Sequence, residues 1–196
     1  MNQLLDYVKV YDDVLTDGMC NELISNFENF NKQTSPFFTY RKSEWNEDYR
    51  QFHEFDIVRV QQFSHMLDPL YKTAQNMFTR YNKECGRFFP EKTGFEDLRI
   101  KRYDANGMDQ FGWHTDVGNY ASARRFLVMF FYLNDVEEGG ETDFQFSGDY
   151  SKEPVFTVKP KRGRMVIFPP MWMFPHRGRT PISGSKYIIS TYAHYQ

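Results

Sequence analysis

The second half of the chain has the hydrophobic pattern of a sheet-rich domain. Residues 125–133 form a nearly continuous apolar run, which predicts a strand buried on both faces. Aromatic and β-branched side chains in this run favour a strand over a buried helix. Shorter strands bounded by Gly- and Pro-containing turns are expected at 98–103, 112–116, 155–158, 164–168 and 187–193. Many short strands with such breaks are typical of a β-barrel or a β-sandwich.

The first half shows helical spacing instead. A short strand at 7–11 precedes an expected helix at about 16–30, whose first residues can cap it and whose apolar residues recur at helical intervals. A second helical stretch covers about 57–85, and Pro69 is expected to interrupt it or to begin a new helix. Residues 31–53 have no clear period and are expected to form a loop or an irregular hairpin. Helices followed by strands predict an α+β domain with N-terminal helices supporting one sheet.

Length and composition add limits to this picture. The 196 residues suffice for a single domain, with 1–97 as mainly helical support and lid and 98–196 as the β core. The net charge of −2 argues against a broad basic surface, so no nucleic-acid partner is expected. No apolar stretch is long enough to span a membrane, and the N-terminus lacks a signal-peptide pattern. With Cys20 and Cys85 alone, no disulfide framework is expected. These features predict a soluble, cytoplasmic protein.

Two histidines and one carboxylate are the candidate metal ligands. His114 and Asp116 are spaced as His-x-Asp, and His176 lies in the last part of the chain. Residues i and i+2 of a strand point to the same face, so the first two side chains can converge on one ion. Such a set is the facial triad of non-haem Fe(II) oxygenases. The spacing alone leaves open that each histidine is an ordinary core or surface residue.

Further motifs accompany these three residues along the chain. In order, the matching residues are Tyr103, His114-Thr115-Asp116, Arg125, Tyr132-Leu133-Asn134-Asp135, Gly139-Gly140-Glu141-Thr142, Lys161-Arg162-Gly163-Arg164, Phe168-Pro169, His176, Pro181, Gly184 and Lys186. This ordered set resembles the 2-oxoglutarate- and Fe(II)-dependent dioxygenases of the prolyl 4-hydroxylase type. The resemblance covers 97–196, and residues 11–29 resemble that family's first strand and helix. It implies a double-stranded β-helix (jelly-roll) core.

The resemblance also implies the chemistry of the site. Fe(II) is expected on His114, Asp116 and His176, with 2-oxoglutarate and O2 in the remaining coordination positions and ascorbate as a further cofactor. Lys186 is expected to bind the distal carboxylate of 2-oxoglutarate, because a hairpin after His176 brings the two residues onto neighbouring strands. Tyr103 and Thr142 are expected to complete this pocket. The alternatives are that Lys186 is a solvated strand residue and that Tyr103 is an ordinary core tyrosine.

Three further residues are candidates for substrate binding. Arg125 heads an apolar strand, where an arginine is costly unless it is paired. The resemblance directs Arg125 to the substrate groove, and a salt-bridged strand end is the alternative. Trp113 and Tyr192 are expected to line the pocket, although aromatic residues are also common in β cores. No partner spacing is found for the remaining histidines, which are expected not to bind metal: His53, His65 and His194.

The resemblance implies hydroxylation of a C–H bond, with a prolyl residue of a peptide or protein as the expected substrate. Residues 31–53 and 117–124 are expected to form lids over it. The second of these loops is short for a prolyl hydroxylase, so a free amino acid or another small molecule is the alternative substrate. A non-catalytic metal-binding β-barrel and a zinc hydrolase are further alternatives. Neither of these alternatives needs the dicarboxylate-binding residues Lys186 and Tyr103. A halogenase is disfavoured because Asp116 leaves no coordination position for chloride.

Overall fold

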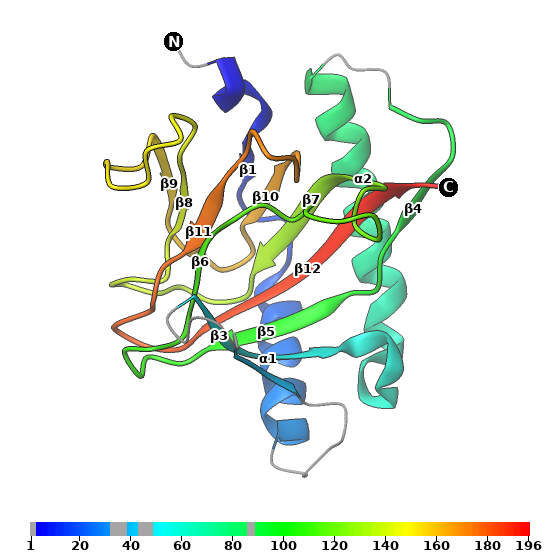
Figure 1. Ribbon diagram of the computed structural model, residues 1–196. Helices are drawn as coiled ribbons and strands as arrows, with labels where there is room; N and C mark the ends of the chain where they lie inside the picture. Colours follow the sequence, from blue (N-terminus) through cyan, green and yellow to red (C-terminus); the bar gives the residue numbers. More distant parts are fainter. Residues whose placement is uncertain (1–2, 32–38, 43–48, 86–88) are drawn as a thin grey trace.

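The computed structural model describes residues 3–31, 39–42, 49–85 and 89–196 (Figure 1). Its helices are η1 (Gln3–Tyr7), α1 (Asp17–Asn31), η2 (Ile57–Arg59), η3 (Gln61–Phe63) and α2 (Ser64–Cys85), where η marks a 3-10 helix. Its strands are β1 (Lys9–Tyr11), β2 (Thr39–Lys42), β3 (Arg50–Asp56), β4 (Thr93–Phe95), β5 (Arg99–Tyr103), β6 (Gln110–His114), β7 (Arg125–Tyr132), β8 (Thr142–Phe144), β9 (Phe156–Val158), β10 (Met165–Phe168), β11 (His176–Gly178) and β12 (Lys186–Tyr195).

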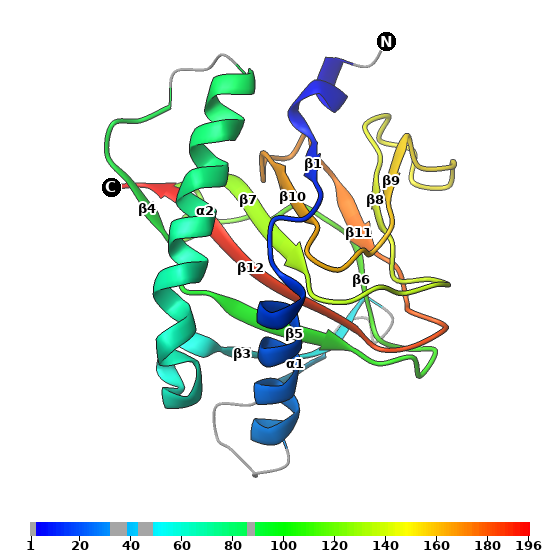
Figure 2. The same cartoon turned by 180° about the vertical axis from the view of Figure 1, so that it is seen from behind.

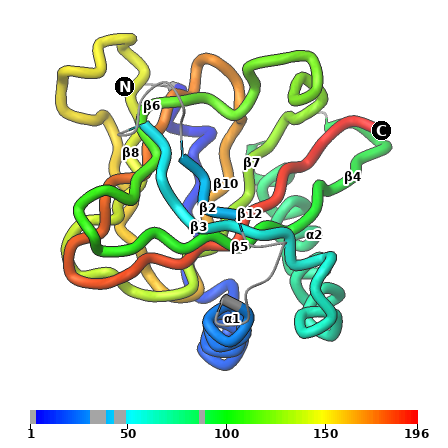
Figure 3. Tube along the Cα trace, turned by 60° about the horizontal axis from the view of Figure 1, so that its bottom comes forward, coloured from blue at the N-terminus to red at the C-terminus, as the bar shows by residue number. Residues whose placement is uncertain are grey.

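The strands form one continuous antiparallel sheet that curves around an interior. Their order is β1-β10-β7-β12-β5-β3-β6-β11-β8-β9, with β2 added to β3 and β4 added to β12. Strand β3 joins the two walls, because it pairs with β5 along one part of its length and with β6 along another (Figure 3). This arrangement is the expected jelly-roll, and strands that are distant in sequence meet at its centre.

Strand β7 confirms the prediction of a strand buried on both faces. Alternate side chains of this strand point to opposite sides of the sheet. Leu127, Met129 and Phe131 pack in the core beneath the helices. Val128 and Phe130 pack in a second core inside the curved sheet. Burial of each such side chain contributes about 1.5–3 kcal/mol, so β7 anchors both halves of the core.

Both long helices cover the same face of the sheet, as expected (Figure 2). Leu23 and Phe27 of α1 are fully buried, as is Leu70 of α2. The hydroxyl of Thr16 accepts a hydrogen bond from the backbone N–H of Met19, which confirms the expected cap of α1. The opposite face of the sheet is left to line the interior, and this is where the functional side chains gather.

The expectation for Pro69 was wrong. Pro69 lies inside α2, which continues from Ser64 to Cys85. Proline removes one backbone hydrogen bond and costs about 3 kcal/mol within a helix. That cost is exceeded here because one face of α2 is buried along its length, through Met66, Leu70, Ala74, Met77, Phe78 and Tyr81.

The structure also differs from the expected strand limits near the candidate ligands. Strand β6 ends at His114, so Asp116 lies in the following loop and not in the strand. The backbone N–H of Asp116 donates to the carbonyl of Pro170, 3.2 Å away. Residues 31–53 contain the β2–β3 hairpin, and the expected lid at 32–38 and 43–48 falls outside the described residues.

Two expectations from composition can be compared with the described chain. Both cysteines are free, with Cys20 buried and Cys85 partly buried. In the residues that the structure describes, none of the helices combines the length and the apolar character needed to cross a membrane.

Candidate metal centre and adjoining cavities

The three candidate ligands meet where β6 and β11 pair. His114 ends β6 and His176 begins β11, and the antiparallel register places these two residues directly opposite each other. Their ring centroids are 4.2 Å apart. Asp116 reaches the same point from the loop after β6. The spacing His-x-Asp therefore brings the side chains together, although one of them lies outside the strand.

The ligand atoms have the separation that a shared ion requires. Nε2 of His176 lies 3.3 Å from Oδ2 of Asp116, and Nε2 of His114 lies 3.9 Å from Oδ1. The three ligand atoms all lie within 4.8 Å of one another. Metal–nitrogen bonds of about 2.1 Å at right angles put neighbouring ligands about 3 Å apart. Small adjustments therefore suffice for one divalent cation to contact all three.

Hydrogen bonds from the backbone fix which nitrogen of each imidazole is available. Nδ1 of His114 lies 2.8 Å from the carbonyl of Gly112, and Nδ1 of His176 lies 3.1 Å from the carbonyl of Phe174. A carbonyl accepts only, so Nδ1 carries the proton and Nε2 presents its lone pair. Burial lowers the pKa of His114 to about 3, helped by His176 beside it, and burial also lowers the pKa of His176. Both rings are neutral at neutral pH, as metal ligands must be.

Asp116 carries a buried oxygen atom that lacks a donor. Its Oδ1 accepts a hydrogen bond from the Tyr192 hydroxyl at 2.7 Å, whereas Oδ2 is buried and has no hydrogen-bond partner. Burial alone would raise the pKa of Asp116, but the facing imidazoles and the Tyr192 hydroxyl keep it below the ordinary value. A buried acceptor without a partner costs about 1–3 kcal/mol. A divalent cation would satisfy Oδ2, so the residues present fit a metal.

Arg125 forms the salt bridge at the strand end that was one of its two expected roles. Its guanidinium donates two hydrogen bonds of 2.8 Å to the carboxylate of Glu96, so the strand end is salt-bridged. It also donates to the backbone carbonyl of Asp116 at 3.2 Å and lies over the ring of Tyr192, 3.9 Å from its centroid. Arg125 thus braces both the backbone and the hydrogen-bond donor of Asp116, and its side chain lines a cavity beside the three candidate ligands.

Replacing Tyr192 by phenylalanine is expected to weaken divalent-metal affinity by about 10-fold, because hydrogen-bond partners of metal ligands typically contribute 10–100-fold. The variant leaves the Asp116 carboxylate ionised but less firmly oriented. Calorimetric titration of Fe(II) or Mn(II) under anaerobic conditions measures the change. Tyr187→Phe is the matched control, since the Tyr187 hydroxyl donates to Glu28 and not to a candidate ligand. Equal affinity in wild type and Tyr192→Phe would contradict this role.

An inner cavity of about 50 Å³ extends from the triad to Lys186. Lys186 is 2 % exposed, and its ammonium group donates to the carbonyl of Gly140 at 2.9 Å and lies 4.3 Å from the ring centroid of Tyr103. An ammonium group has three donors, so two remain for a ligand. Burial lowers the pKa of Lys186 to about 7. A Cβ added to Gly178 would lie 3.4 Å from the ammonium nitrogen, so glycine keeps this approach open.

Tyr103 and Thr142 lie on the wall of the inner cavity. Lys186 and Tyr103 are register partners on β12 and β5. No described residue shares a hydrogen bond with the Tyr103 hydroxyl, whereas the Thr142 hydroxyl lies 2.6 Å from that of Tyr132. The apolar pattern of 125–133 did not single out Tyr132 as a functional residue, although a tyrosine within this run was a signal. Tyr132 holds Thr142 toward the cavity.

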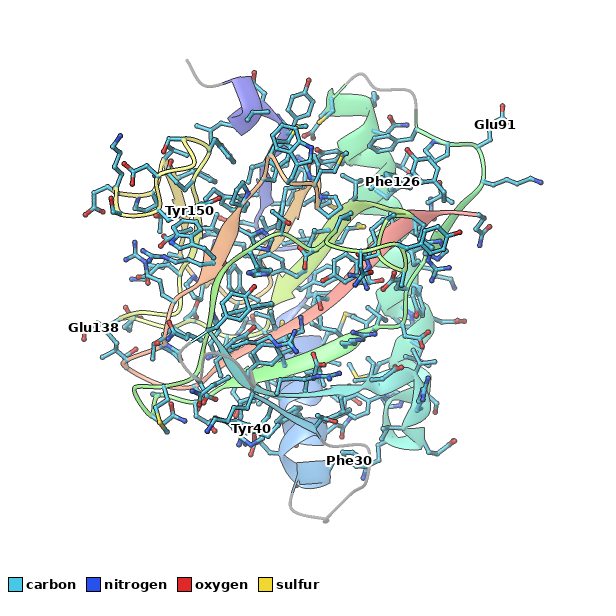
Figure 4. All side chains as sticks on the ribbon, in the orientation of Figure 1. Phe30, Tyr40, Glu91, Phe126, Glu138 and Tyr150 are labelled. Carbon is cyan, nitrogen blue, oxygen red and sulfur yellow. The ribbon has the colours of Figure 1, made fainter. Side chains whose placement is uncertain are left out.

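An outer cavity of about 310 Å³ opens on the other side of the triad. Arg125 and Tyr192 line it together with Lys101, which the sequence did not single out as functional. Strand alternation did put Lys101 on the same face as Tyr103, so a signal existed. Trp113 is not brought to either cavity. Its ring packs against Tyr150, on the loop after β8 (Figure 4), because it points away from the face that carries His114.

A second group of possible ligand atoms has a structural explanation. His53, Asp104 and Asp109 lie close enough to hold an ion. However, the buried Asp109 carboxylate accepts hydrogen bonds from the Tyr40 hydroxyl, the Asn106 side chain and the Asp104 backbone. These bonds organise the turn between β5 and β6. His65 and His194 belong to no such group within the described residues.

Comparisons with known proteins agree with this geometry. The sequence model of the 2OG-Fe(II) oxygenase superfamily matches residues 98–194, which contain all three candidate ligands and Lys186. The Arabidopsis thaliana protein named "Probable prolyl 4-hydroxylase 11" is 34% identical over 107 residues, or 53% of this chain. The match covers 35% of that relative, so this chain corresponds to about a third of its length.

Solved structures resemble the whole fold. The viral collagen prolyl hydroxylase of Paramecium bursaria Chlorella virus-1, solved with 2-oxoglutarate, has a TM-score of 0.68 at 22% identity over 97% of both chains. A Trichoplax adhaerens prolyl hydroxylase, solved with a fragment of hypoxia inducible factor, has a TM-score of 0.75 at 18% identity, covering 99% of this chain and 86% of the other. A Pseudomonas putida prolyl-4-hydroxylase has a TM-score of 0.67 at 16% identity over 97% and 93%. At these identities the likeness establishes the fold.

Proposed function

Because the chain belongs to the 2OG-Fe(II) oxygenase superfamily, we propose that it is a 2-oxoglutarate-dependent dioxygenase that hydroxylates a prolyl residue of a peptide or protein. The observation that carries this proposal is the convergence of His114, Asp116 and His176 beside the buried ammonium group of Lys186. A metal-binding module or a zinc hydrolase would have no use for a buried cation with spare donors at this position.

Each cavity has its own role in this proposal. His114, Asp116 and His176 hold Fe(II), which together with 2-oxoglutarate and O2 supplies the oxidising power for hydroxylation, with ascorbate as the reductant that keeps it ferrous. Lys186 and the Tyr103 hydroxyl bind carboxylate groups of 2-oxoglutarate in the inner cavity, with Thr142 beside them. The buried walls keep water away from the reacting groups. The substrate enters through the outer cavity.

We propose that residues 1–196 act as one catalytic domain. The β core at 98–196 carries the ligands, and the preceding residues support it through α1 and α2. Strand β3 also contributes Phe52 and Glu54 to the outer cavity. The prolyl substrate is proposed because relatives in sequence and in structure carry the name prolyl hydroxylase. A small-molecule substrate is the alternative that the experiment below distinguishes.

Anaerobic addition of Fe(II) and 2-oxoglutarate tests the proposal directly. We expect a metal-to-ligand absorption band, followed by succinate release when O2 is admitted. Proline-rich peptides and free amino acids are then offered in parallel, and mass spectrometry detects the gain of one oxygen atom. If 2-oxoglutarate neither binds nor turns over in the iron-loaded protein, the dioxygenase proposal is wrong. Succinate release with hydroxylation of free amino acids and of no peptide would replace the prolyl-peptide substrate by a small molecule.

The affinity for 2-oxoglutarate is expected to fall as the pH rises above about 7. Burial lowers the pKa of Lys186 from 10.5 to about 7, and only the ammonium form attracts a carboxylate. Above that pH, binding must first take up a proton, which lowers the affinity by up to about tenfold per pH unit. Anaerobic calorimetry in buffers of different ionisation enthalpy measures both the affinity and the proton uptake. An affinity that stays constant from about pH 6 to about pH 9 would contradict this assignment.

A further inference from the structure

The described residues that line the outer cavity carry an excess of positive charge. Its lining includes two carboxylates, Glu54 and Asp116, and five cationic side chains, which are Arg41, Arg50, Arg99, Lys101 and Arg125. Asp116 belongs to the metal centre. A cavity of about 310 Å³ is large enough for a small ligand or for a side chain of a peptide. The charge of this lining therefore bears on the chemistry of the substrate.

Two of the five cations are compensated by neighbouring carboxylates. Arg41 forms an ion pair with Glu54, and Arg125 forms its two-bond pair with Glu96. Among the described residues, the side chains of Arg50, Arg99 and Lys101 form neither an ion pair nor a hydrogen bond. Glu54 lies opposite Lys101 in the strand register, and its carboxylate, which is ion-paired with Arg41, also attracts Lys101 and Arg99. The single carboxylate of Glu54 is thus shared among Arg41, Lys101 and Arg99, and the described lining keeps an excess of cationic groups.

The sheet directs these cations toward the triad. Ile100, between Arg99 and Lys101 on β5, is fully buried beneath the helices, so the two charged side chains point to the opposite, interior face. Lys101 lines both cavities, and its ammonium group lies 5.5 Å from the ring centroid of Phe52. Arg50, on the adjacent strand β3, lies over the ring of Phe111 at 5.6 Å. These aromatic contacts orient the cations without neutralising them.

Cations in excess of carboxylates are costly in a partly enclosed cavity, because burial removes water without supplying a full counter-charge. A ligand with an anionic group would remove that cost on binding. The 2-oxoglutarate proposed above lies with Lys186 in the inner cavity, which Lys101 also lines, but it does not reach the lining residues Arg50 and Arg99 of the outer cavity. The anion expected in the outer cavity therefore comes from the primary substrate.

We propose that the outer cavity selects a substrate that carries a carboxylate next to the hydroxylated group, with Lys101 and Arg99 as its binding residues and Arg50 at the side of the cavity. This inference rests on the proposed function and narrows it. In a peptide, the carboxylate belongs to an acidic residue adjacent to the target proline. In a small molecule, it is the carboxylate of the substrate itself. Lys101 and Arg99 are specificity-determining residues in both cases.

Matched pairs of probes that differ in one charge test the selection. Peptides with glutamate or glutamine on either side of a central proline form one set, and free proline with its amide forms the other. We expect the acid in one set to exceed its neutral partner by about tenfold or more in kcat/KM and in calorimetric affinity for the anaerobic Fe(II)–2-oxoglutarate complex. The set that shows the preference identifies the source of the carboxylate.

Variants connect the preference to the residues. The double variant Lys101→Gln, Arg99→Gln is expected to reduce the acid-over-amide ratio to about two or less. The single variant Lys101→Glu is expected to reverse it, so that lysine beside the proline is preferred over glutamate. Lys72→Gln, an exposed residue of α2 on the other face of the sheet, keeps the wild-type ratio. Binding of the neutral probe by each variant serves as the reference for correct folding.

Two results would overturn the inference. One is equal affinity of the wild-type protein for acid and amide probes in both sets. The other is a double variant that weakens the two members of a pair by the same factor. Failure of the proposed function has a different signature, namely the absence of 2-oxoglutarate binding and of succinate for every probe. In that event, calorimetric affinity of the Mn(II)-loaded protein for the same pairs decides the inference without turnover.

Discussion

Replacing Asp116 by asparagine is expected to lower Fe(II) affinity by at least about 100-fold and to remove succinate formation, while the metal-free protein unfolds no earlier than wild type. The affinity falls because a neutral amide replaces the one anionic ligand, and loss of even an indirect partner of a ligand costs 10–100-fold. Stability is retained because the amide keeps the oxygen that accepts from Tyr192 and removes a buried charge whose Oδ2 has no partner.

Thermal unfolding with and without metal separates these two effects. Wild type should gain about 2.7 kcal/mol when the free metal concentration is 100 times its Kd, and Asp116→Asn should gain almost nothing at the same concentration. Asp143→Asn is the matched control. Its carboxylate is fully buried and accepts hydrogen bonds from Arg177 and Arg179, so the substitution should destabilise the metal-free protein and leave metal affinity unchanged. Wild-type Fe(II) affinity in Asp116→Asn would show that this carboxylate is structural.

The features predicted correctly from the sequence are those with dense local signals. The apolar run of β7 is long enough to specify a strand buried on both faces, and the caps and spacing of α1 specify a helix. The family resemblance supplied the jelly-roll and the candidate cofactor residues, because its motifs occur in one order over half of the chain. Lys186 and Tyr103 could be assigned to one pocket from the sequence, because the family motifs around them indicate the strands on which they lie.

Strands that depend on distant partners were not predictable in this way. Strand β11 has three residues, His-Arg-Gly, without any apolar alternation, and it exists because β6 and β8 pair with its two edges. Strand β3 is mostly polar, yet it joins the two walls of the barrel through β5 and β6. Local propensity does not contain these pairings, which arise only when the sheet closes.

The direction of side chains was the other feature in which the structure differs from the sequence-based expectation. Alternation correctly groups Arg99, Lys101 and Tyr103, but it cannot state which face of β5 lies inside the barrel, and charged residues are ordinarily assigned to solvent. The same ambiguity applies to Trp113, whose aromatic character suggested a pocket. Its neighbour His114 occupies the interior face, so Trp113 must point outward, where the guanidinium of Arg177 lies 4.8 Å from its ring centroid.

Replacing Lys186 by methionine is expected to weaken 2-oxoglutarate binding by about 100-fold or more, with Fe(II) affinity nearly unchanged. The ammonium group is buried beside Tyr103 and retains two donors after its bond to Gly140, so it is available for a carboxylate. Loss of one partner of a buried charge pair costs about 2–5 kcal/mol, and each 1.4 kcal/mol is tenfold in affinity. Methionine has a similar length and leaves no charge to bury, so the fold should be retained.

Anaerobic calorimetry with Fe(II) first and 2-oxoglutarate second measures the two affinities separately. The decline of 2-oxoglutarate affinity above about pH 7 should disappear in Lys186→Met, because the residue that titrates is absent. Lys72→Met, on the exposed side of α2, is the control and should retain both affinities and the pH dependence. An equal loss of Fe(II) and 2-oxoglutarate in Lys186→Met would mean that Lys186 supports the structure of the site as a whole. Lys186 would then be buried because it packs against Tyr103, and another cation of the inner cavity would have to bind the distal carboxylate of 2-oxoglutarate.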